Sequence, residues 1–283
     1  MASCLQSRRH TLRKALVACV IAMIGAGAGA AEAPVNMEAH YAVYMTHVHV
    51  GEITWAVYFS EQTYLASANG KASGVFSVLL KGEGSVTTHG EMTDGRLVPV
   101  QVITAITDDD GQDEVKMTFE NGDLKHLEAD GPPPKASLVQ VTPNLLRHII
   151  DPLSAMLIPV DNDAFAHANC DKTLPIFDGR RRYNLALSYK RIEKMQIAHG
   201  YSGRVLVCGV MMRAIAGYDP DSLLVRYLAG KDGLELWFAP VAGREIIAPV
   251  RALMPTLIGT LEMRETEFEP GRPKAAHGSP PPQ

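Results

Sequence analysis

The sequence lacks the short motifs that mark the common enzyme classes. Its 283 residues contain no G-x-S-x-G nucleophile motif and no glycine-rich phosphate loop ahead of a helix. His47 and His49 have the spacing of two side chains on one face of a strand. A zinc site needs a third and usually a fourth ligand, and nothing in the sequence brings one near this pair. We therefore expect no catalytic residues, no metal and no cofactor.

Acidic residues are absent from the first 30 positions, and this absence has a specific meaning. A basic stretch from Arg8 to Lys14 is followed by an apolar run from Ala15 to Ile24 and by Ala28-Gly29-Ala30. This order is typical of a cleavable export signal, with cleavage expected near Ala30. A membrane anchor is the weaker alternative, because a spanning helix needs about 20 apolar residues. Ser7 to Arg13 resembles a twin-arginine signal, so Sec and twin-arginine export both stay open.

Cysteine is scarce. Cys4 and Cys19 lie in the expected signal, which leaves Cys170 and Cys208 in the mature chain. Two cysteines in an oxidising compartment favour one disulfide. The alternative is two buried free thiols.

Basic residues are fewer than acidic ones. Loss of residues 1–30 leaves 23 of the 27 Lys and Arg against 31 Asp and Glu, a formal charge of −8. Such a surface repels nucleic acid, which we exclude as a partner.

Helical patterns are also rare, whereas alternating strand patterns between turn signals are frequent. We expect a mainly β protein: a large curved antiparallel sheet or half-open β-barrel with one or two short helices. Gly51-Glu52 is expected to join the first two strands. The expected strands are residues 40–50, 53–59, 98–107, 114–120, 123–128, 181–189, 203–215, 222–229, 234–239 and 260–268.

One longer helix is predicted in the middle of the chain. Thr142-Pro143 has the form of an N-cap followed by proline at the first helical position. Apolar residues then recur at helical spacing as far as Leu157, with a break at Pro152. Residues 74–81 fit either a second short helix or a strand. Residues 31–268 are expected to form a single domain, and residues 269–283 a disordered tail.

Three consecutive arginines follow an Asp-Gly turn at residues 178–179. Strand alternation predicts that Arg181 heads an apolar face that continues with Tyr183. Arg180 and Arg182 then face solvent. A buried guanidinium must be paired, and two partners for Arg181 stay open. One is the turn's aspartate or its backbone carbonyls, and the other is a ligand's carboxylate or phosphate at the mouth of an apolar groove. Arg181 and Tyr183 are the candidate ligand-binding residues.

Several segments share a pattern with a known family. Cys170 is followed by PIFDGRRRY at residues 175–183. The other segments are residues 41–52, 151–155, 208–218 and 249–259. Together they resemble a family of exported bacterial proteins catalogued as domain of unknown function 3108, over nearly the whole mature chain. The resemblance implies a periplasmic, strand-rich, non-enzymatic protein and supplies no catalytic residues.

Two hypotheses for function follow. The curved sheet is similar in outline to the half-open barrels of periplasmic lipoprotein carriers, which hold acyl chains in their hollow. The first hypothesis is therefore a periplasmic protein that binds a lipid or other amphiphilic envelope component in a concave groove. The second is a structural or interaction protein of the cell envelope, with a filled barrel and an envelope protein as its partner. An open apolar cavity favours the first hypothesis, and a packed interior favours the second.

Overall fold

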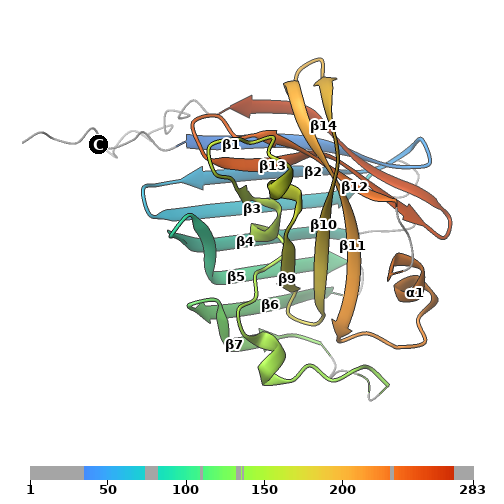
Figure 1. The fold of residues 1–283 in the computed structure, drawn as a ribbon. Coiled ribbons are helices and arrows are strands. Elements are labelled where there is room, and N and C mark those ends of the chain that lie inside the picture. Colours follow the sequence, from blue (N-terminus) through green and yellow to red (C-terminus); the bar gives the residue numbers. More distant parts are fainter. Residues whose placement is uncertain are drawn as a thin grey trace, which may run out of the picture. The chain divides into compact units, whose positions relative to one another are not determined.

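The structure, a computed structural model, is built almost entirely from antiparallel strands that follow one another along the chain (Figure 1). It describes residues 35–73, 82–108, 111–131, 135, 137–229 and 233–270. The expected signal peptide, the ambiguous segment 74–81 and residues 271–283 lie outside the described residues. The strands are β1 Val35–Met45, β2 Val48–Phe59, β3 Thr63–Ala72, β4 Gly82–Thr93, β5 Arg96–Asp108, β6 Gly111–Glu120, β7 Asp123–Ala129, β8 Ile158–Pro159, β9 Thr173–Phe177, β10 Arg182–Gln196, β11 Ser202–Ala216, β12 Leu234–Pro240, β13 Ile246–Thr256 and β14 Gly259–Pro270.

These strands form one open sheet. Its order is β7-β6-β5-β4-β3-β2-β1-β14-β13-β12-β11-β10-β9, with β8 paired to β13. The first seven strands and the last six are therefore two meanders, joined where β1 pairs with β14. Because β7 and β9 do not pair with each other, the sheet curves without closing (Figure 1). The predicted fold class is confirmed.

The first hairpin turn lies earlier than the sequence predicted. It is formed by Thr46 and His47, both with positive φ, and not by Gly51-Glu52. Gly51 instead lies inside β2, where an added Cβ would be 2.9 Å from the Lys71 carbonyl oxygen. A glycine within a strand often marks such a close backbone approach. Because His47 lies in the turn, it does not share a strand face with His49, so that expectation was wrong.

Strands β3 and β4 were not predicted, because their sequences are rich in small polar residues. Tyr64 and Ala66 of β3 are buried, whereas Leu65 and Asn69 are exposed. The alternation is present, but alanine on the inner face is a weaker signal than the branched or aromatic residues typical of strands.

The predicted helix between residues 142 and 157 is wrong. Two 3-10 turns, η2 (Pro143–Leu146) and η3 (Ser154–Met156), are separated by extended chain. The backbone N–H of Ile149 donates to the Gly122 carbonyl, and that of Ile150 to the Pro175 carbonyl. The β6–β7 turn and β9 thus accept the hydrogen bonds that a helix would have made internally. The apolar residues nevertheless point inward, as the periodicity suggested.

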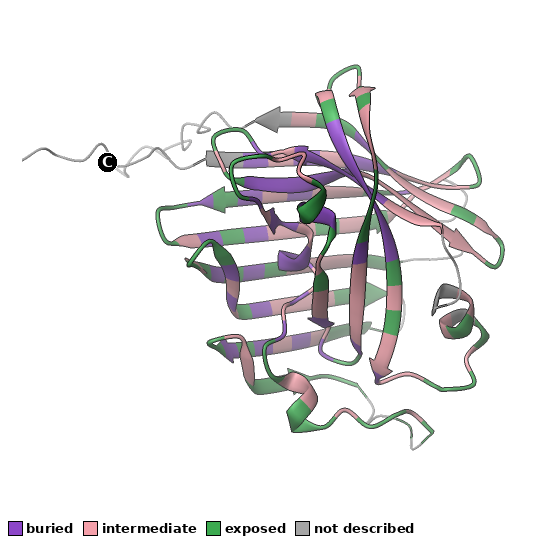
Figure 2. Ribbon diagram, in the orientation of Figure 1, coloured by how far each residue is buried: buried purple, intermediate pink, exposed green. Residues whose placement is uncertain are grey.

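Residues 149–160, here called the inner segment, fill the space between the two meanders. Leu153 and Leu157 pack in the core that contains Trp55 and Phe59. Ile158 belongs to a second core cluster built on β10 to β13. Figure 2 shows buried residues along both the inner segment and the strands around it. The concave face of the sheet is therefore largely covered by the chain itself.

A short helix, α1 (Leu223–Ala229), replaces the strand predicted at residues 222–229. The Ser222 side-chain oxygen accepts a hydrogen bond from the backbone N–H of Val225 at 3.4 Å, as an N-cap does. The β-branched and aromatic residues there suggested a strand. Intrinsic helix and strand propensities are small, however, and a local N-cap hydrogen bond outweighs them. Within the described residues, no helix is long and apolar enough to span a membrane.

The disulfide between Cys170 and Cys208 is confirmed, with the two Cα atoms 5.5 Å apart. It joins η4 (His167–Cys170) to β11, and both cysteines are fully buried in the second core cluster. At the other end of the fold, β14 continues to Pro270, which pairs with Met37. This strand therefore extends past residue 268, where its end was expected.

Candidate functional site

The turn before β10 is held tightly by its own aspartate. One Asp178 carboxylate oxygen accepts hydrogen bonds from the backbone N–H groups of Arg180 at 2.9 Å and Arg181 at 2.6 Å. Gly179 has φ of +93°, and an added Cβ would lie 2.3 Å from a Val115 methyl group. Only glycine satisfies both the backbone conformation and this close approach. The turn therefore sets the direction in which the arginine side chains leave the backbone.

Among the three arginines, Arg182 is the buried one, so the predicted alternation was wrong. The strand begins at Arg182, and its guanidinium donates to the Leu145 carbonyl at 3.0 Å and to the Asn184 side-chain oxygen at 2.6 Å. The face that carries Arg182 is covered by η2, which strand periodicity cannot reveal. Burial lowers the pKa of Arg182 from its ordinary value, and the hydrogen bonds replace the water that it has lost.

Arg181 lies on the surface and is only loosely paired. Its side chain is 56% exposed, and its terminal nitrogen is 3.8 Å from the second Asp178 oxygen. Its guanidinium carbon lies 6.0 Å from the centre of the Tyr218 ring. A guanidinium has five N–H donors, so most of the hydrogen-bonding capacity of Arg181 faces solvent. The Asp178 contact is the internal partner that the sequence suggested.

An apolar groove of about 410 Å³, here called the arginine groove, lies beside this turn. Arg180 and Arg181 are the charged side chains among its described lining residues, and each lies near an aspartate outside the lining. Arg180 is 4.0 Å from Asp113, and Arg181 is 3.8 Å from Asp178. Arg180 also donates to the Asp130 carbonyl at 2.5 Å, which fixes its side chain across the groove rim. The lining residues are Leu127, Ala129, Gly131, Leu138, Val139, Gln140, Val141, Leu146, Phe177, Gly179, Arg180, Arg181 and Gly217.

Two distant segments meet to form the wall of the groove. The Val139 N–H donates to the Tyr218 carbonyl at 2.9 Å, and the Gly217 N–H donates to the Val139 carbonyl at 2.7 Å. Gly217 has φ of +79°, and a Cβ there would be 2.2 Å from the Arg180 carbonyl oxygen. The arginine segment and the segment ending at Tyr218, which both carry the family resemblance, therefore touch here. Their chain order did not indicate this contact.

Tyr183, the other predicted ligand residue, is not among the groove's lining residues. Its side chain is half-buried near the start of β10. Burial, and secondarily the nearby Asp178 carboxylate, raise the pKa of its hydroxyl.

A second cleft lies between the β4–β5 turn, the inner segment and β9. It has a volume of about 900 Å³ and a mixed lining that includes Phe119, Ile149 and Leu157. Glu91, Asp94, Glu120 and Asp161 outnumber Arg96 and Lys172 in that lining. An anionic ligand is therefore less suited to this cleft than to the arginine groove.

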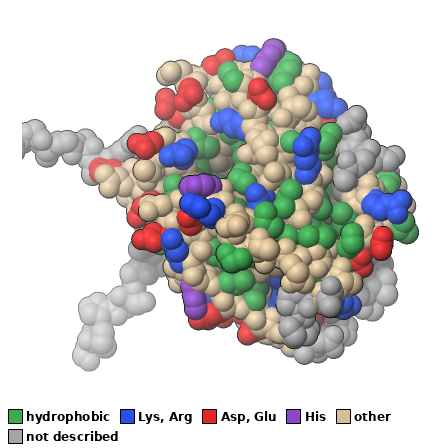
Figure 3. Space-filling view, turned by 60° about the horizontal axis from the view of Figure 1, so that its bottom comes forward, with side chains coloured by type: hydrophobic (Ala, Val, Ile, Leu, Met, Phe, Trp, Pro, Cys, Tyr) green, Lys and Arg blue, Asp and Glu red, His purple; other side chains and the backbone are tan. Residues whose placement is uncertain are grey.

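The surface around the arginine groove is mixed in character. Figure 3, which brings the bottom of Figure 1 forward, shows hydrophobic side chains gathered near the middle of this face with basic side chains among them. Val139 is 44% exposed and Leu127 is 39% exposed. Sequence reasoning missed both, because Val139 lies in a loop and Leu127 lies in a charged strand. In the described part of the chain, no three His, Cys, Asp or Glu side chains are grouped as a metal site requires.

The fold defines a class of strand-rich proteins in which one open antiparallel sheet wraps around a segment of its own chain. The chain belongs to the family described as protein of unknown function DUF3108, whose family model matches residues 40–266. A similar structure is the crystal structure of a beta-barrel-like protein of domain of unknown function DUF1849 from Brucella abortus. The TM-score is 0.47 at 9% identity, over 83% of this chain and 97% of that chain. No curated protein matches the sequence.

Proposed function

We propose that the protein is a non-enzymatic binding protein of the periplasm that holds an amphiphile with an anionic head group in the arginine groove. The observation that carries this proposal is the position of Arg181, exposed and loosely paired, at the rim of an apolar groove. The acyl part of the ligand would lie against Leu138, Val139 and Val141. Ligand sites commonly have this form, with an apolar lining and a few polar groups that fix orientation.

The two arginines at the rim indicate the chemical type of the head group. Arg180 and Arg181 are close in sequence and line the same groove, while the protein as a whole is acidic. Arginine binds carboxylate and phosphate through two parallel hydrogen bonds. A ligand with one of these groups gains such bonds at the rim, whereas a neutral head group of equal size does not.

The periplasmic location rests on the export signal expected in the sequence. The Cys170–Cys208 disulfide supports it, because such bonds persist in oxidising compartments. Protein recovered from the periplasm should therefore have the mass of a chain that starts at Ala31. A mass that still includes residues 1–30 would contradict cleavage.

A structural role in the envelope is the second candidate, and the inner segment favours it. Leu157 and Ile158 are almost fully buried between the two meanders, so the central hollow of the sheet is occupied. On this alternative the groove is a surface depression, and the protein acts through contacts with an envelope protein. The two candidates differ in whether a small amphiphile binds at all.

Native mass spectrometry of the mature protein, purified from its own periplasm without detergent, tests the proposal. We expect a bound species with the mass of a lipid or fatty acid, lost or strongly reduced in Arg181→Ala. Arg226→Ala, which removes an exposed arginine from α1, should keep it. A ligand-free spectrum together with no lipid in a solvent extract would favour the structural alternative.

A binding assay with two synthetic probes measures how much the charge of the head group contributes to affinity. Dodecyl phosphate and dodecanol share one alkyl chain and differ in charge. We expect dodecyl phosphate to bind about tenfold more tightly, a difference of about 1.4 kcal/mol, and Arg181→Ala to abolish this preference. Val139→Trp, which fills the groove without removing an arginine, should weaken the binding of both probes. Equal affinity of the native protein for the two probes would contradict an anionic head group.

A further inference from the structure

A further hollow lies on the face of the sheet that points away from the core, and its chemistry differs from that of the arginine groove and the second cleft. It has a volume of about 590 Å³ and spans β1 to β6. Its Thr54, Asn69 and Ser85 alternate along their strands with the core residues Trp55, Ala68 and Val86, so it lies on the outer face. We call it the outer trough. The residues that line it are His40, Glu52, Thr54, Asn69, Gly70, Lys71, Glu83, Gly84, Ser85, Ala105, Thr107 and Gln112.

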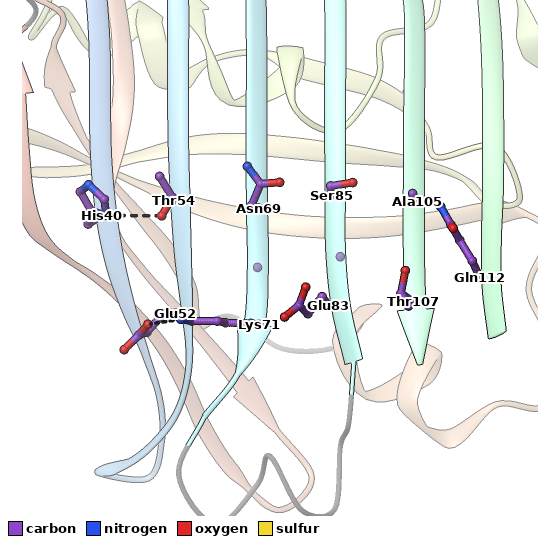
Figure 4. A pocket seen from close by; sticks show the side chains of 12 residues that line it. His40, Glu52, Thr54, Asn69, Lys71, Glu83, Ser85, Ala105, Thr107 and Gln112 are labelled. Carbon is purple, nitrogen blue, oxygen red and sulfur yellow. Dashed lines mark hydrogen bonds and ion pairs between the residues drawn. The ribbon is translucent and has the colours of Figure 1, made fainter. Parts of the chain in front are cut away.

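The side chains of the outer trough form two parallel rows, as Figure 4 shows. Strand register places Thr54 opposite Asn69, Asn69 opposite Ser85, and Ser85 opposite Ala105. The other row runs from Glu52 through Lys71, Glu83 and Thr107 to Gln112. Neighbouring strands are about 4.8 Å apart, so each row presents one side chain at each such step.

The sizes of these residues explain why the face is hollowed. The middle of the first row is made of short side chains, and His40 stands at its end, where its ring nitrogen is 3.3 Å from the Thr54 hydroxyl oxygen. Apart from Thr107, the other row consists of longer side chains such as Lys71 and Glu83. The short residues are the floor of the trough and the long ones are its wall.

The lining selects a class of ligand. Ala105 is the one apolar side chain among the described residues that line the trough, so an acyl chain would gain little there. Glu52, Glu83 and Lys71 give a formal charge of −1 with His40 neutral, so an anion is not attracted. Lys71 is paired with Glu52 at 3.4 Å. What remains is a series of hydroxyl, carboxamide and carboxylate groups, which hydrogen-bond to hydroxyl groups.

We infer that the outer trough binds a neutral linear oligosaccharide, laid across the strands with successive sugar units over successive strands. The distance between neighbouring side chains in a row, about 4.8 Å, is close to the length of one sugar unit along an extended glycan chain. Glu83 has no ion pair among the described residues and accepts hydrogen bonds from sugar hydroxyls. Because the described lining residues offer no aromatic platform other than the His40 ring, affinity comes from many hydrogen bonds and depends on chain length.

Isothermal titration of the mature protein with chitotetraose, cellotetraose and maltotetraose, and with the matching disaccharides, tests this inference. We expect at least one tetrasaccharide to bind with a dissociation constant of about 1 mM or lower, and about tenfold more tightly than its disaccharide. Absence of binding by all three tetrasaccharides at this level would overturn it. Equal affinity for a tetrasaccharide and its disaccharide would also overturn it.

Two tyrosine variants give a matched pair. Ser85→Tyr places a ring on the floor of the trough and should weaken binding about tenfold or more. Thr87→Tyr places the same ring two residues along β4, on the same exposed face but outside the lining, and should leave affinity within about twofold. Equal losses in both variants would contradict a site at this position. Arg181→Ala should not change oligosaccharide affinity, so the test is independent of the amphiphile proposal.

Discussion

At the scale of single residues, Glu265 is a buried carboxylate whose surroundings change its protonation. It lies in β14 and is 1% exposed. One carboxylate oxygen accepts a hydrogen bond from the Tyr201 N–H at 3.2 Å, and the other accepts none from the described residues. Burial raises the pKa of Glu265 to about 7, and the single hydrogen bond opposes this only in part. The folded protein therefore holds a proton that the unfolded chain releases near its ordinary pKa of 4.5.

This shift predicts a pH dependence of stability. Between about pH 4.5 and pH 7 the folded state binds more protons than the unfolded state, so the Glu265 contribution to the free energy of unfolding falls as pH rises. The full loss is roughly 3 kcal/mol. Glu265→Gln keeps the acceptor for Tyr201 and removes the titration. Urea unfolding at pH 5 and pH 8 should therefore show the variant gaining stability relative to the native protein at the higher pH.

Glu267→Gln is the control, because Glu267 lies in the same strand and is exposed. It should change stability little, and by the same amount at both pH values. If Glu265→Gln follows this pattern as well, Glu265 is not titrating in this range.

At the scale of elements, one carboxylate supplies side-chain hydrogen bonds that link the inner segment to β4. A single oxygen of Asp151 accepts from the Thr88 hydroxyl at 2.8 Å and from the N–H groups of Leu153 at 3.0 Å and Ser154 at 3.1 Å. The Ser154 hydroxyl is in turn 2.7 Å from the Tyr64 hydroxyl. The other Asp151 oxygen is buried and accepts no hydrogen bond from the described residues. Burial raises the pKa of Asp151, so its neutral form is favoured relative to an exposed aspartate.

We therefore predict that Asp151 stabilises the fold as a hydrogen-bond acceptor and not through its negative charge. Asp151→Ala leaves three buried donors without an acceptor and should lower the free energy of unfolding by about 3 kcal/mol or more. Asp151→Asn keeps the acceptor and should cost clearly less than Asp151→Ala, although its buried amide N–H groups gain no acceptor. Denaturant unfolding of both variants measures the difference. Equal losses would show that the negative charge itself stabilises the inner segment.

At the scale of the whole molecule, two long-range connections define the fold. One is the pairing of β1 with β14, which brings Met37 opposite Pro270 and joins the two meanders. The other is the disulfide, which closes a loop of sequence separation 38 around β9 and β10. In the chain-entropy model, a disulfide that closes a loop of this length raises the free energy of unfolding by about 4 kcal/mol.

We therefore predict that the double variant Cys170→Ala with Cys208→Ala unfolds at a markedly lower temperature than the oxidised native protein. Native protein treated with a reductant should behave similarly, because the bond and not the cysteine side chains supplies most of the effect. Thermal unfolding followed by circular dichroism measures both. A native protein whose unfolding temperature is unchanged by complete reduction would contradict this account.

The extent to which the sequence predicted the structure follows from the range of the interactions involved. Strands such as β5 and β6 were predictable because alternation and turn residues act over a few positions. The disulfide was predictable because only Cys170 and Cys208 remain after the expected cleavage. The inner segment was predicted to be apolar but not to be extended, because its backbone hydrogen bonds go to residues such as Gly122 and Pro175 that lie far away in the chain.

By itself the sequence determined the mainly β class, the family resemblance, the turn at Asp178-Gly179 and the single cysteine pair. The tertiary structure alone decided that Arg182 is buried and Arg181 exposed, because the covering segment η2 comes from residues 143–146. It alone brought Val139 beside Gly217 to form the arginine groove, and aligned Thr54, Asn69 and Ser85 in one row. The physical reason is the same in each case: local patterns record which side of an element faces the core, whereas the contacts between elements depend on how the sheet is paired and curved.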